Sequence, residues 1–219
     1  MNAAPQPELE LPITASPPPK RAADRWAIAV HEAGHAVAAV FYEIPLTAAF
    51  VILHEVGSDT VAGRVRYDWE KVKLQMQSSP RARCASKLIV MGYAGFFAEL
   101  KAKPSAHNGD SEYDGGQIHN FLLKHFSYKR KSEGRTGSQQ TPPEAEIARA
   151  YNARSRRLVL VTRRLVDWLY PIIVMVALTL LERRRMTGEE VVALAGPLIA
   201  KKRAAMNGSR RLKSYEIMD

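Results

Sequence analysis

The chain has 219 residues, of which 46% are hydrophobic and 25% charged, and this composition is typical of one globular domain with short tails. Its single cysteine excludes a disulfide-based scaffold and a zinc site made from several cysteines of one chain. The sequence contains neither G-x-x-x-x-G-K-[ST] nor G-x-G-x-x-G, so it carries neither of these two phosphate-binding loops.

The net charge of +10 is unevenly distributed, because residues 1–123 sum to −1 and residues 124–219 sum to +11. The excess lies in clusters such as Lys129-Arg130-Lys131, Arg183-Arg184-Arg185 and Lys201-Lys202-Arg203. A basic half can bind nucleic acid or an anionic membrane surface, or it can form the solvated faces and C-termini of helices. We favour solvated helices, because aromatic residues that stack on bases are not interleaved with the clusters.

The N-terminal half is expected to hold one buried helix and a small sheet. Residues 1–22 are rich in proline and predict a disordered arm, without the basic start and apolar run of a secretory signal. A helix from Asp24 to about Tyr42 is apolar nearly all round, which is typical of a buried helix. Two strands follow, Ala48–Glu55 and Val61–Tyr67, with a turn at Gly57-Ser58-Asp59.

Helices make up the rest of the expected fold. We expect them from about Pro80 to Leu100 or Lys103, from Ser111–Asp114 onward, from Pro143 to about Asp167, from Pro171 to near Arg185, and over Val191–Ala200 after a capping box at Thr187-Gly188-Glu189-Glu190. The prediction is a mainly α fold with a small β-sheet (α+β), a domain over residues 23–200 and a basic tail over residues 201–219.

The most apolar stretch, Pro171–Leu181, is about half of the ~20 residues that a membrane span needs. Charged residues lie upstream of it and directly after it. We therefore expect no membrane span and a cytoplasmic protein.

His31-Glu32-Ala33-Gly34-His35 has the pattern H-E-x-x-H within the expected buried helix. Residues four apart share one face of a helix, so His31 and His35 can both point a ring nitrogen at one Zn²⁺ ion. Glu32 would lie beside the metal, where it can take a proton from a metal-bound water as that water attacks a carbonyl. Unpaired His and Glu would be costly in an apolar helix, which favours a metal site. The small Ala33 and Gly34 would let a strand or a substrate backbone pass close to the helix.

A catalytic zinc site needs a third protein ligand and an open position for water. The extended pattern H-E-x-x-H-x-x-G-x-x-H is excluded, because Ala38 and Phe41 occupy its last two fixed positions. We interpret Cys84 as a helix core residue and not a nucleophile, since no base is expected beside it. The candidates for the third ligand are the acids and histidines downstream, namely Glu55, Glu99, His107, Asp110, Asp114 and His119.

Five blocks of the sequence also carry a family resemblance. They are WAIAVHEAGHAVAAVFY at Trp26–Tyr42, FVILHEVGSDTVAGRVR at Phe50–Arg66, GYAGFFAEL at Gly92–Leu100, SEYDGGQI at Ser111–Ile118 and the helical region Glu144–Val191. In this order they resemble the peptidase domain of FtsH-type ATP-dependent zinc metalloproteases, over about residues 24–195. The resemblance implies a zincin-like helical metallopeptidase domain with H-E-x-x-H on a buried helix.

The resemblance also implies a ligand set. In that family the third zinc ligand is an aspartate at the start of the helix after the loop. Asp114 matches it best, and Asp110 is the alternative. Glu99 matches a helix glutamate that supports the site, where it could orient a histidine; as a ligand itself it would give a two-His-one-Glu site. The sequence departs from the family's pattern at Gly115-Gly116, which follow Asp114, and at Phe96, which stands where the family has arginine.

The second predicted strand has a candidate role in binding substrate. An extended peptide could pair with its edge beside the zinc through main-chain hydrogen bonds. Gly63 would permit a close approach. The residues of this candidate substrate strand are Val61, Ala62, Gly63, Arg64 and Val65. The alternative is an ordinary edge strand.

We therefore predict a zinc-dependent endopeptidase that hydrolyses unfolded or flexible polypeptides. FtsH-type proteases carry membrane segments and an ATPase module before the peptidase domain. This sequence has neither, so we expect a stand-alone domain that uses a separate unfoldase or forms a homo-oligomer. The alternative is a non-catalytic zinc-fold module that binds nucleic acid or a protein partner through residues 124–219. The presence of Glu32 opposes that alternative, because a structural zinc site has no use for a base.

Overall fold

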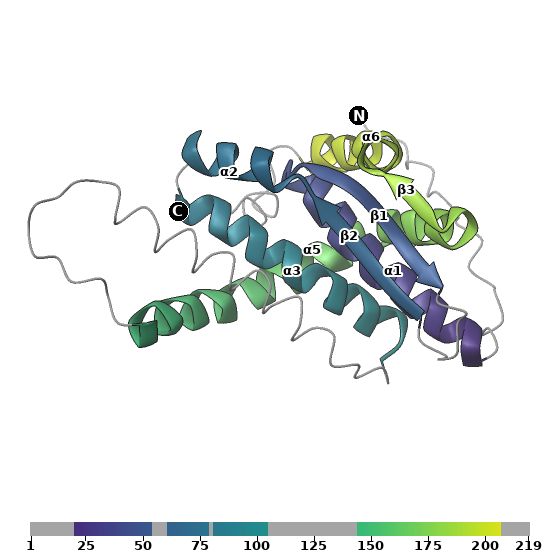
Figure 1. The fold of residues 1–219 in the computed structure, drawn as a ribbon, viewed down its shortest axis with the longest axis horizontal. Coiled ribbons are helices and arrows are strands. Elements are labelled where there is room, and N and C mark those ends of the chain that lie inside the picture. The colour runs from purple at the N-terminus through teal and green to yellow at the C-terminus, as the bar shows by residue number, and fades with distance from the viewer. Residues whose placement is uncertain (1–19, 54–60, 79–80, 105–143, 207–219) are drawn as a thin grey trace, which may run out of the picture.

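The computed structural model describes residues 20–53, 61–78, 81–104 and 144–206 (Figure 1). The helices and strands of these residues are, in chain order, α1 (Lys20–Phe41), β1 (Leu46–Leu53), β2 (Val61–Tyr67), α2 (Trp69–Ser78), α3 (Arg81–Ala102), α5 (Glu144–Arg183), β3 (Arg185–Thr187) and α6 (Gly188–Met206). The predicted class, mainly α with a small β-sheet, is confirmed.

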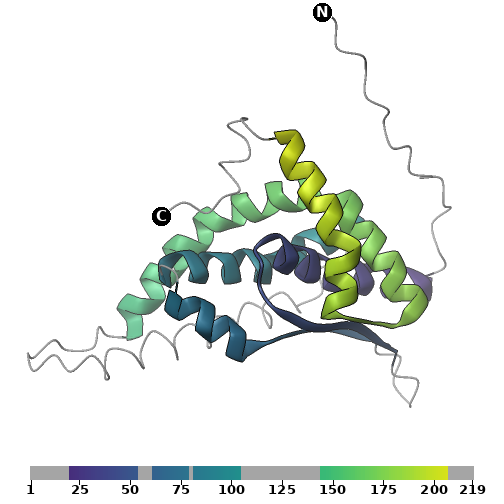
Figure 2. The same ribbon diagram turned by 90° about the horizontal axis from the view of Figure 1, so that it is seen from above.

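Helix α1 forms the centre of the molecule, with the sheet on one side and α3 and α5 on others (Figures 1 and 2). Small buried side chains occur all round the helix: Ala29, Val30, Ala33, Ala36, Val37 and Ala39. A helix that is apolar nearly all round has to be enclosed by other elements, as the sequence predicted. The helix begins at Lys20, inside the range 1–22 that the sequence assigned to a disordered arm.

The sheet has three antiparallel strands in the order β2-β1-β3. In the register of β1 and β2, Gly63 lies opposite Val51. Along β2, Val65 packs against the core whereas Arg64 is exposed, so the odd-numbered positions face α1. The predicted edge position of β2 is confirmed within the described part of the chain, because its outer side pairs with no other described strand.

Two short elements, α2 and β3, were not predicted. Helix α2 follows Asp68, whose Oδ1 accepts a hydrogen bond of 3.1 Å from the main-chain nitrogen of Lys71. This bond lowers the pKa of the Asp68 carboxyl and is typical of a residue that caps a helix. Strand β3 has three residues and pairs with β1 through Met186, which lies opposite Ala49 and is buried. Its formation depends on tertiary packing, which a local pattern does not show.

Helix α5 corrects the prediction of two helices, one ending at about Asp167 and the next beginning at Pro171, because one helix runs through both residues. Proline removes a main-chain hydrogen bond and normally kinks or breaks the interior of a helix. The Pro171 ring is exposed, whereas Leu169, Ile172 and Ile173 beside it are buried in the core. Burial of these side chains against the rest of the protein stabilises the helix across the proline.

The continuity of α5 lengthens its apolar segment. By length and composition alone, Arg157–Arg183 could cross a membrane, and 44% of the most apolar window of this helix is buried inside the protein. A core helix of a globular protein has the same property. The absence of a membrane span therefore stays a prediction.

Helix α6 begins with the predicted capping box, which is confirmed. The main-chain nitrogen of Thr187 donates to Oε2 of Glu190 at 2.7 Å, and the main-chain nitrogen of Glu190 donates to Oγ1 of Thr187 at 3.1 Å. The bond from the Thr187 backbone lowers the pKa of the Glu190 carboxyl. Both side chains therefore satisfy main-chain groups that a helix leaves without partners at its start.

The end of α6 differs from the prediction, because the helix continues to Met206 instead of ending near Ala200. Residues 201–206 of the predicted basic tail are therefore helical. Arg203 donates a hydrogen bond to the main-chain oxygen of Phe41, and its guanidinium carbon lies 4.3 Å from the centroid of the Phe41 ring. One cation of the basic second half thus stabilises the C-terminus of α1.

We expect Thr187→Ala to lower the free energy of unfolding by about 0.5–2 kcal/mol, because a main-chain N–H at the start of α6 loses its partner. Equilibrium unfolding in urea measures this difference. An unchanged free energy of unfolding would contradict the stabilising role of the capping box.

We expect the stability contributed by Glu190 to depend on pH. A carboxyl whose pKa is lower in the folded than in the unfolded protein stabilises the fold above its unfolded pKa, and this contribution is lost as pH falls through the folded pKa. Glu190→Gln should therefore be less stable than wild type at neutral pH, and the difference should shrink in acid. Urea unfolding over a pH series measures it, with Glu189→Gln as the control. A difference that does not change with pH would contradict the expectation.

Candidate metal centre

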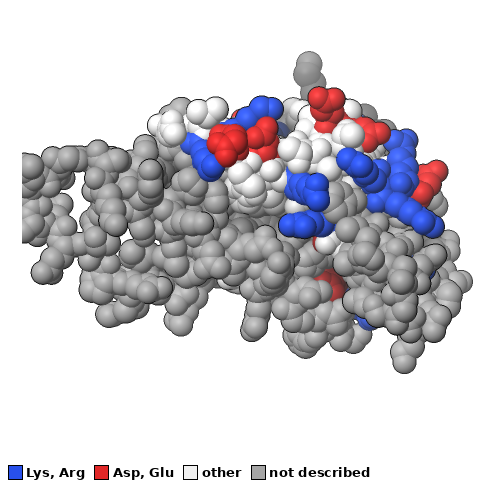
Figure 3. Space-filling view, viewed as in Figure 1, with Lys and Arg blue, Asp and Glu red and all other residues white. Residues whose placement is uncertain are grey.

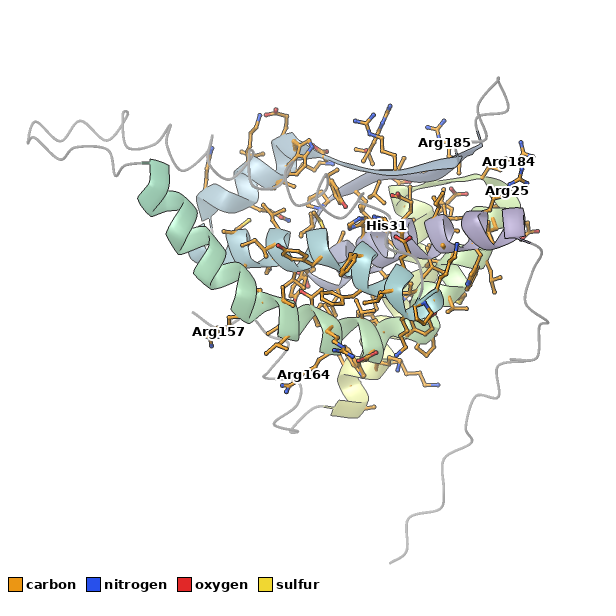
Figure 4. The ribbon with its side chains drawn as sticks, turned by 90° about the horizontal axis from the view of Figure 1, so that it is seen from below. Arg25, His31, Arg157, Arg164, Arg184 and Arg185 are labelled. Atoms are coloured by element: carbon orange, nitrogen blue, oxygen red, sulfur yellow. The ribbon has the colours of Figure 1, made fainter. Side chains whose placement is uncertain are left out.

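His31 and His35 lie four residues apart on α1 and share one face of the helix. Figure 4 shows His31 in the interior of the molecule, on α1 and beside α3. Both side chains are buried, with relative exposures of 6% and 5% for the two residues. The pair therefore lies in a low-dielectric environment, in which each ring nitrogen needs a polar or charged partner.

The two imidazole rings approach each other through their Nε2 atoms. Their Nε2 atoms lie 3.0 Å apart, the ring centroids are separated by 4.7 Å, and the planes cross at 75°. Nδ1 of His31 lies 2.8 Å from Oε2 of Glu99, and Nδ1 of His35 lies 2.8 Å from the main-chain oxygen of Met91. Both outer nitrogens thus face oxygen acceptors on α3.

These acceptors fix the tautomer of each ring. A main-chain carbonyl only accepts hydrogen bonds, and so does a carboxylate, so both Nδ1 atoms act as donors. In a neutral imidazole the other nitrogen, Nε2, then carries a lone pair. Two such nitrogens 3.0 Å apart can share one cation. Bonds of about 2.0–2.1 Å from Zn²⁺ can reach two nitrogens at this separation, so the pair fits the metal that the motif predicts.

Glu32, the predicted base, is buried between α1 and the edge strand β2, with 7% of its surface exposed. A Cβ atom at Gly63 would be closest to Cγ of Glu32 and would lie 2.5 Å from its Oε1 and 2.7 Å from its Cδ. The backbone of β2 at Gly63 therefore lies against the side chain of Glu32. Gly63 thus brings β2 to Glu32, whereas the close approach of a substrate peptide at Gly63 stays a prediction.

The expectation for Gly34 is corrected, because a helix passes it where a strand or a substrate backbone was predicted. A Cβ at Gly34 would lie 2.7 Å from the main-chain oxygen of Ala94 and 2.8 Å from Cβ of Ala98. Helices α1 and α3 therefore pack at close range through small residues. This packing brings the α3 residues Met91 and Glu99 to the two histidines.

The structure brings together four of the predicted site residues, namely His31, Glu32, His35 and Glu99, and it sets β2 beside them. The contact between Glu99 and a histidine is present, as the resemblance implied. Asp114 and Asp110 lie outside the described residues, as do Glu55, His107 and His119. Within the described ranges, no group of three or more His, Cys, Asp and Glu side chains is arranged to hold a metal. Cys84 is buried on α3, and this burial raises the pKa of its thiol.

Sequence reasoning missed Met91, which acts through its main-chain oxygen. A side-chain pattern does not identify such a residue. The available signal is Gly95, one helical turn later, because a missing side chain there leaves the Met91 carbonyl accessible to the His35 ring.

The described basic residues do not form one patch on the face seen in Figure 3, where Lys and Arg are interspersed with Asp and Glu. In Figure 4, Arg157 and Arg164 lie along α5, while Arg25, Arg184 and Arg185 lie at another end of the molecule. These five arginines therefore form two separate groups.

No protein-family model matches this chain, and no curated protein is significantly similar to it in sequence.

Proposed function

We propose that this protein is a zinc-dependent endopeptidase, similar to the peptidase domain of FtsH-type metalloproteases, that hydrolyses unfolded or flexible polypeptides. One observation carries the proposal. The Nε2 atoms of two buried histidines converge to 3.0 Å while both Nδ1 atoms face acceptors, and an acid follows the first histidine on the same helix. Two oriented imidazoles beside a carboxylate are the arrangement that metal-assisted hydrolysis uses.

The residues of the site have separate tasks in this proposal. His31 and His35 would hold Zn²⁺, which supplies a bound water with a pKa lowered to about 7 and polarises the carbonyl of the scissile bond. Glu32 takes a proton from the attacking water and gives it to the leaving amine. Glu99 and the Met91 carbonyl keep the two rings in the ligating tautomer and orientation.

The third ligand in the proposal is Asp114, with Asp110 as the alternative, and both rest on the family resemblance. The hydrogen bond from Nδ1 of His31 to Oε2 of Glu99 supports an orienting role for Glu99. A metal-bound histidine usually donates the N–H of its other ring nitrogen to a carboxylate or carbonyl oxygen.

Substrate would bind as an extended segment along the outer edge of β2. Main-chain hydrogen bonds to an edge strand recognise a peptide with little dependence on its sequence. The edge position of β2 and its contact with Glu32 support this part of the proposal. A cytoplasmic location and assembly with a separate unfoldase or with further copies of the chain also remain proposals.

The proposal is tested first by metal content and turnover. We expect about one zinc per chain in the full-length protein purified without chelator. Glu32→Gln should keep the zinc but lower the rate of cleavage of an unfolded protein by about 10²–10⁴-fold, because the proton acceptor is removed and the ligands are not.

Asp114→Ala and Asp110→Ala, analysed in the same way, identify the third ligand by loss of zinc. Folded wild-type protein that neither contains nor takes up zinc would overturn the proposal. A steep salt dependence of DNA binding in such protein would favour the non-catalytic alternative.

We expect Glu99→Ala to weaken zinc binding by about 10–100-fold, because His31 loses the acceptor that fixes its tautomer. The zinc affinity of Glu99→Gln should lie between those of Glu99→Ala and wild type, since an amide oxygen still accepts the hydrogen bond. Competition with a chromophoric chelator measures the affinity. The exposed Glu182, replaced by alanine, is the matched control on α5, and an unchanged zinc affinity in Glu99→Ala would contradict the orienting role.

A further inference from the structure

Gly95 of α3 lies against the ring of His35. A Cβ at this position would be closest to Nε2 of His35, and it would lie 2.7 Å from both Cδ2 and Cε1. A Cβ ahead of Nε2 in the ring plane would be much farther from the two carbons than from the nitrogen. The near-equal distances therefore put it over the face of the ring. Gly95 lets the imidazole lie flat against α3 without obstructing the direction of the Nε2 lone pair.

The hydrogen bond on the other side of the ring depends on the same contact. Nδ1 of His35 reaches the main-chain oxygen of Met91 at 2.8 Å, one helical turn before Gly95. A methyl group at position 95 would move the ring away from α3 and lengthen this bond. The contact with Gly95 on the face of the ring and the hydrogen bond from Nδ1 to the Met91 carbonyl thus fix one orientation of His35.

Gly63 has the corresponding relation to Glu32. A Cβ there would meet Cγ, Cδ and Oε1 of Glu32, which include the carboxyl carbon and one of its oxygens. The contact comes from β2, whereas Gly95 belongs to α3. The two glycines touch different members of the H-E-x-x-H motif and come from different elements.

We propose that Gly95 and Gly63 are positioning residues of this centre, Gly95 for the ligand His35 and Gly63 for the base Glu32. The inference rests on the proposed metallopeptidase function for its catalytic consequence. Its geometric part, that each glycine makes room for one side chain of the motif, is independent of any metal.

Substitution by alanine should therefore separate metal binding from turnover. Gly95→Ala should weaken zinc binding by about 10–100-fold, as expected when a ligand loses its orienting partner, and should change the visible absorption spectrum of the Co²⁺-substituted protein. Gly63→Ala should keep the zinc content and the Co²⁺ spectrum but lower kcat by about 100-fold, the effect of a displacement of about 1 Å at a reacting group.

Gly196 of α6 offers a matched control. A Cβ there would meet only Cγ1 of Val192, at 3.9 Å, so Gly196→Ala introduces the same methyl group without a clash. This variant should keep the wild-type zinc affinity and kcat.

Double-mutant cycles on the metal-free full-length protein test the geometry by itself. The destabilisation caused by Gly95→Ala should be lost in a His35→Ala background, and that caused by Gly63→Ala should be lost in a Glu32→Ala background, because the clashing atoms are absent. Urea unfolding measures both cycles.

The outcomes for the two proposals are distinct. Additive stability changes in either cycle would overturn the positioning role of that glycine, whether or not the wild-type protein binds zinc. Wild-type zinc affinity in folded Gly95→Ala, or joint loss of zinc and activity in Gly63→Ala, would also overturn it. Failure of wild-type protein to bind zinc would overturn the proposed function alone.

Discussion

The close packing of α1 against α3 is the constraint on which the site depends. Gly34 touches the main chain at Ala94 and the side chain of Ala98, so the two helix axes approach to within a distance that larger residues would forbid. At this separation the Glu99 side chain and the Met91 carbonyl of α3 reach the rings on α1. A wider separation would remove both hydrogen bonds, and each buried ring nitrogen would lose its acceptor.

A second consequence of this packing is electrostatic. The residues His31, Glu32, His35 and Glu99 are four of the few polar side chains buried among the described residues, and three of them lie within five consecutive residues of α1. Burial of such groups is unfavourable unless they are paired. The hydrogen bonds of His31 to Glu99 and of His35 to the Met91 carbonyl offset part of this cost, and a cation bound by the two Nε2 atoms would offset more of it. The core between α1 and α3 therefore contains polar side chains that apolar packing of the two helices does not require.

The parts of the fold that were predictable from the sequence are those set by local pattern. The apolar helix α1, the alternation along β2 and the reciprocal cap at Thr187 and Glu190 each follow from neighbours in the chain. The continuity of α5 through Pro171 and the pairing of β3 depend on residues far away in sequence. The same division holds in the site: spacing predicts His31 and His35, whereas no side-chain pattern identifies a main-chain acceptor such as Met91.

Edge strand β2 joins the two halves of the proposed chemistry. Its core-facing side has glycine at position 63, against Glu32, and a larger apolar residue at Val65, which packs against the core. A strand that was only structural would bury more apolar surface with a side chain at both positions. The absence of a side chain at Gly63 weakens the packing and the strand propensity of β2. It also leaves room for the Glu32 carboxylate between β2 and α1. An extended peptide added to the outer edge of this strand would lie one strand spacing, about 4.8 Å, from the backbone that touches Glu32. Recognition through the main chain and positioning of the base would then share a single element.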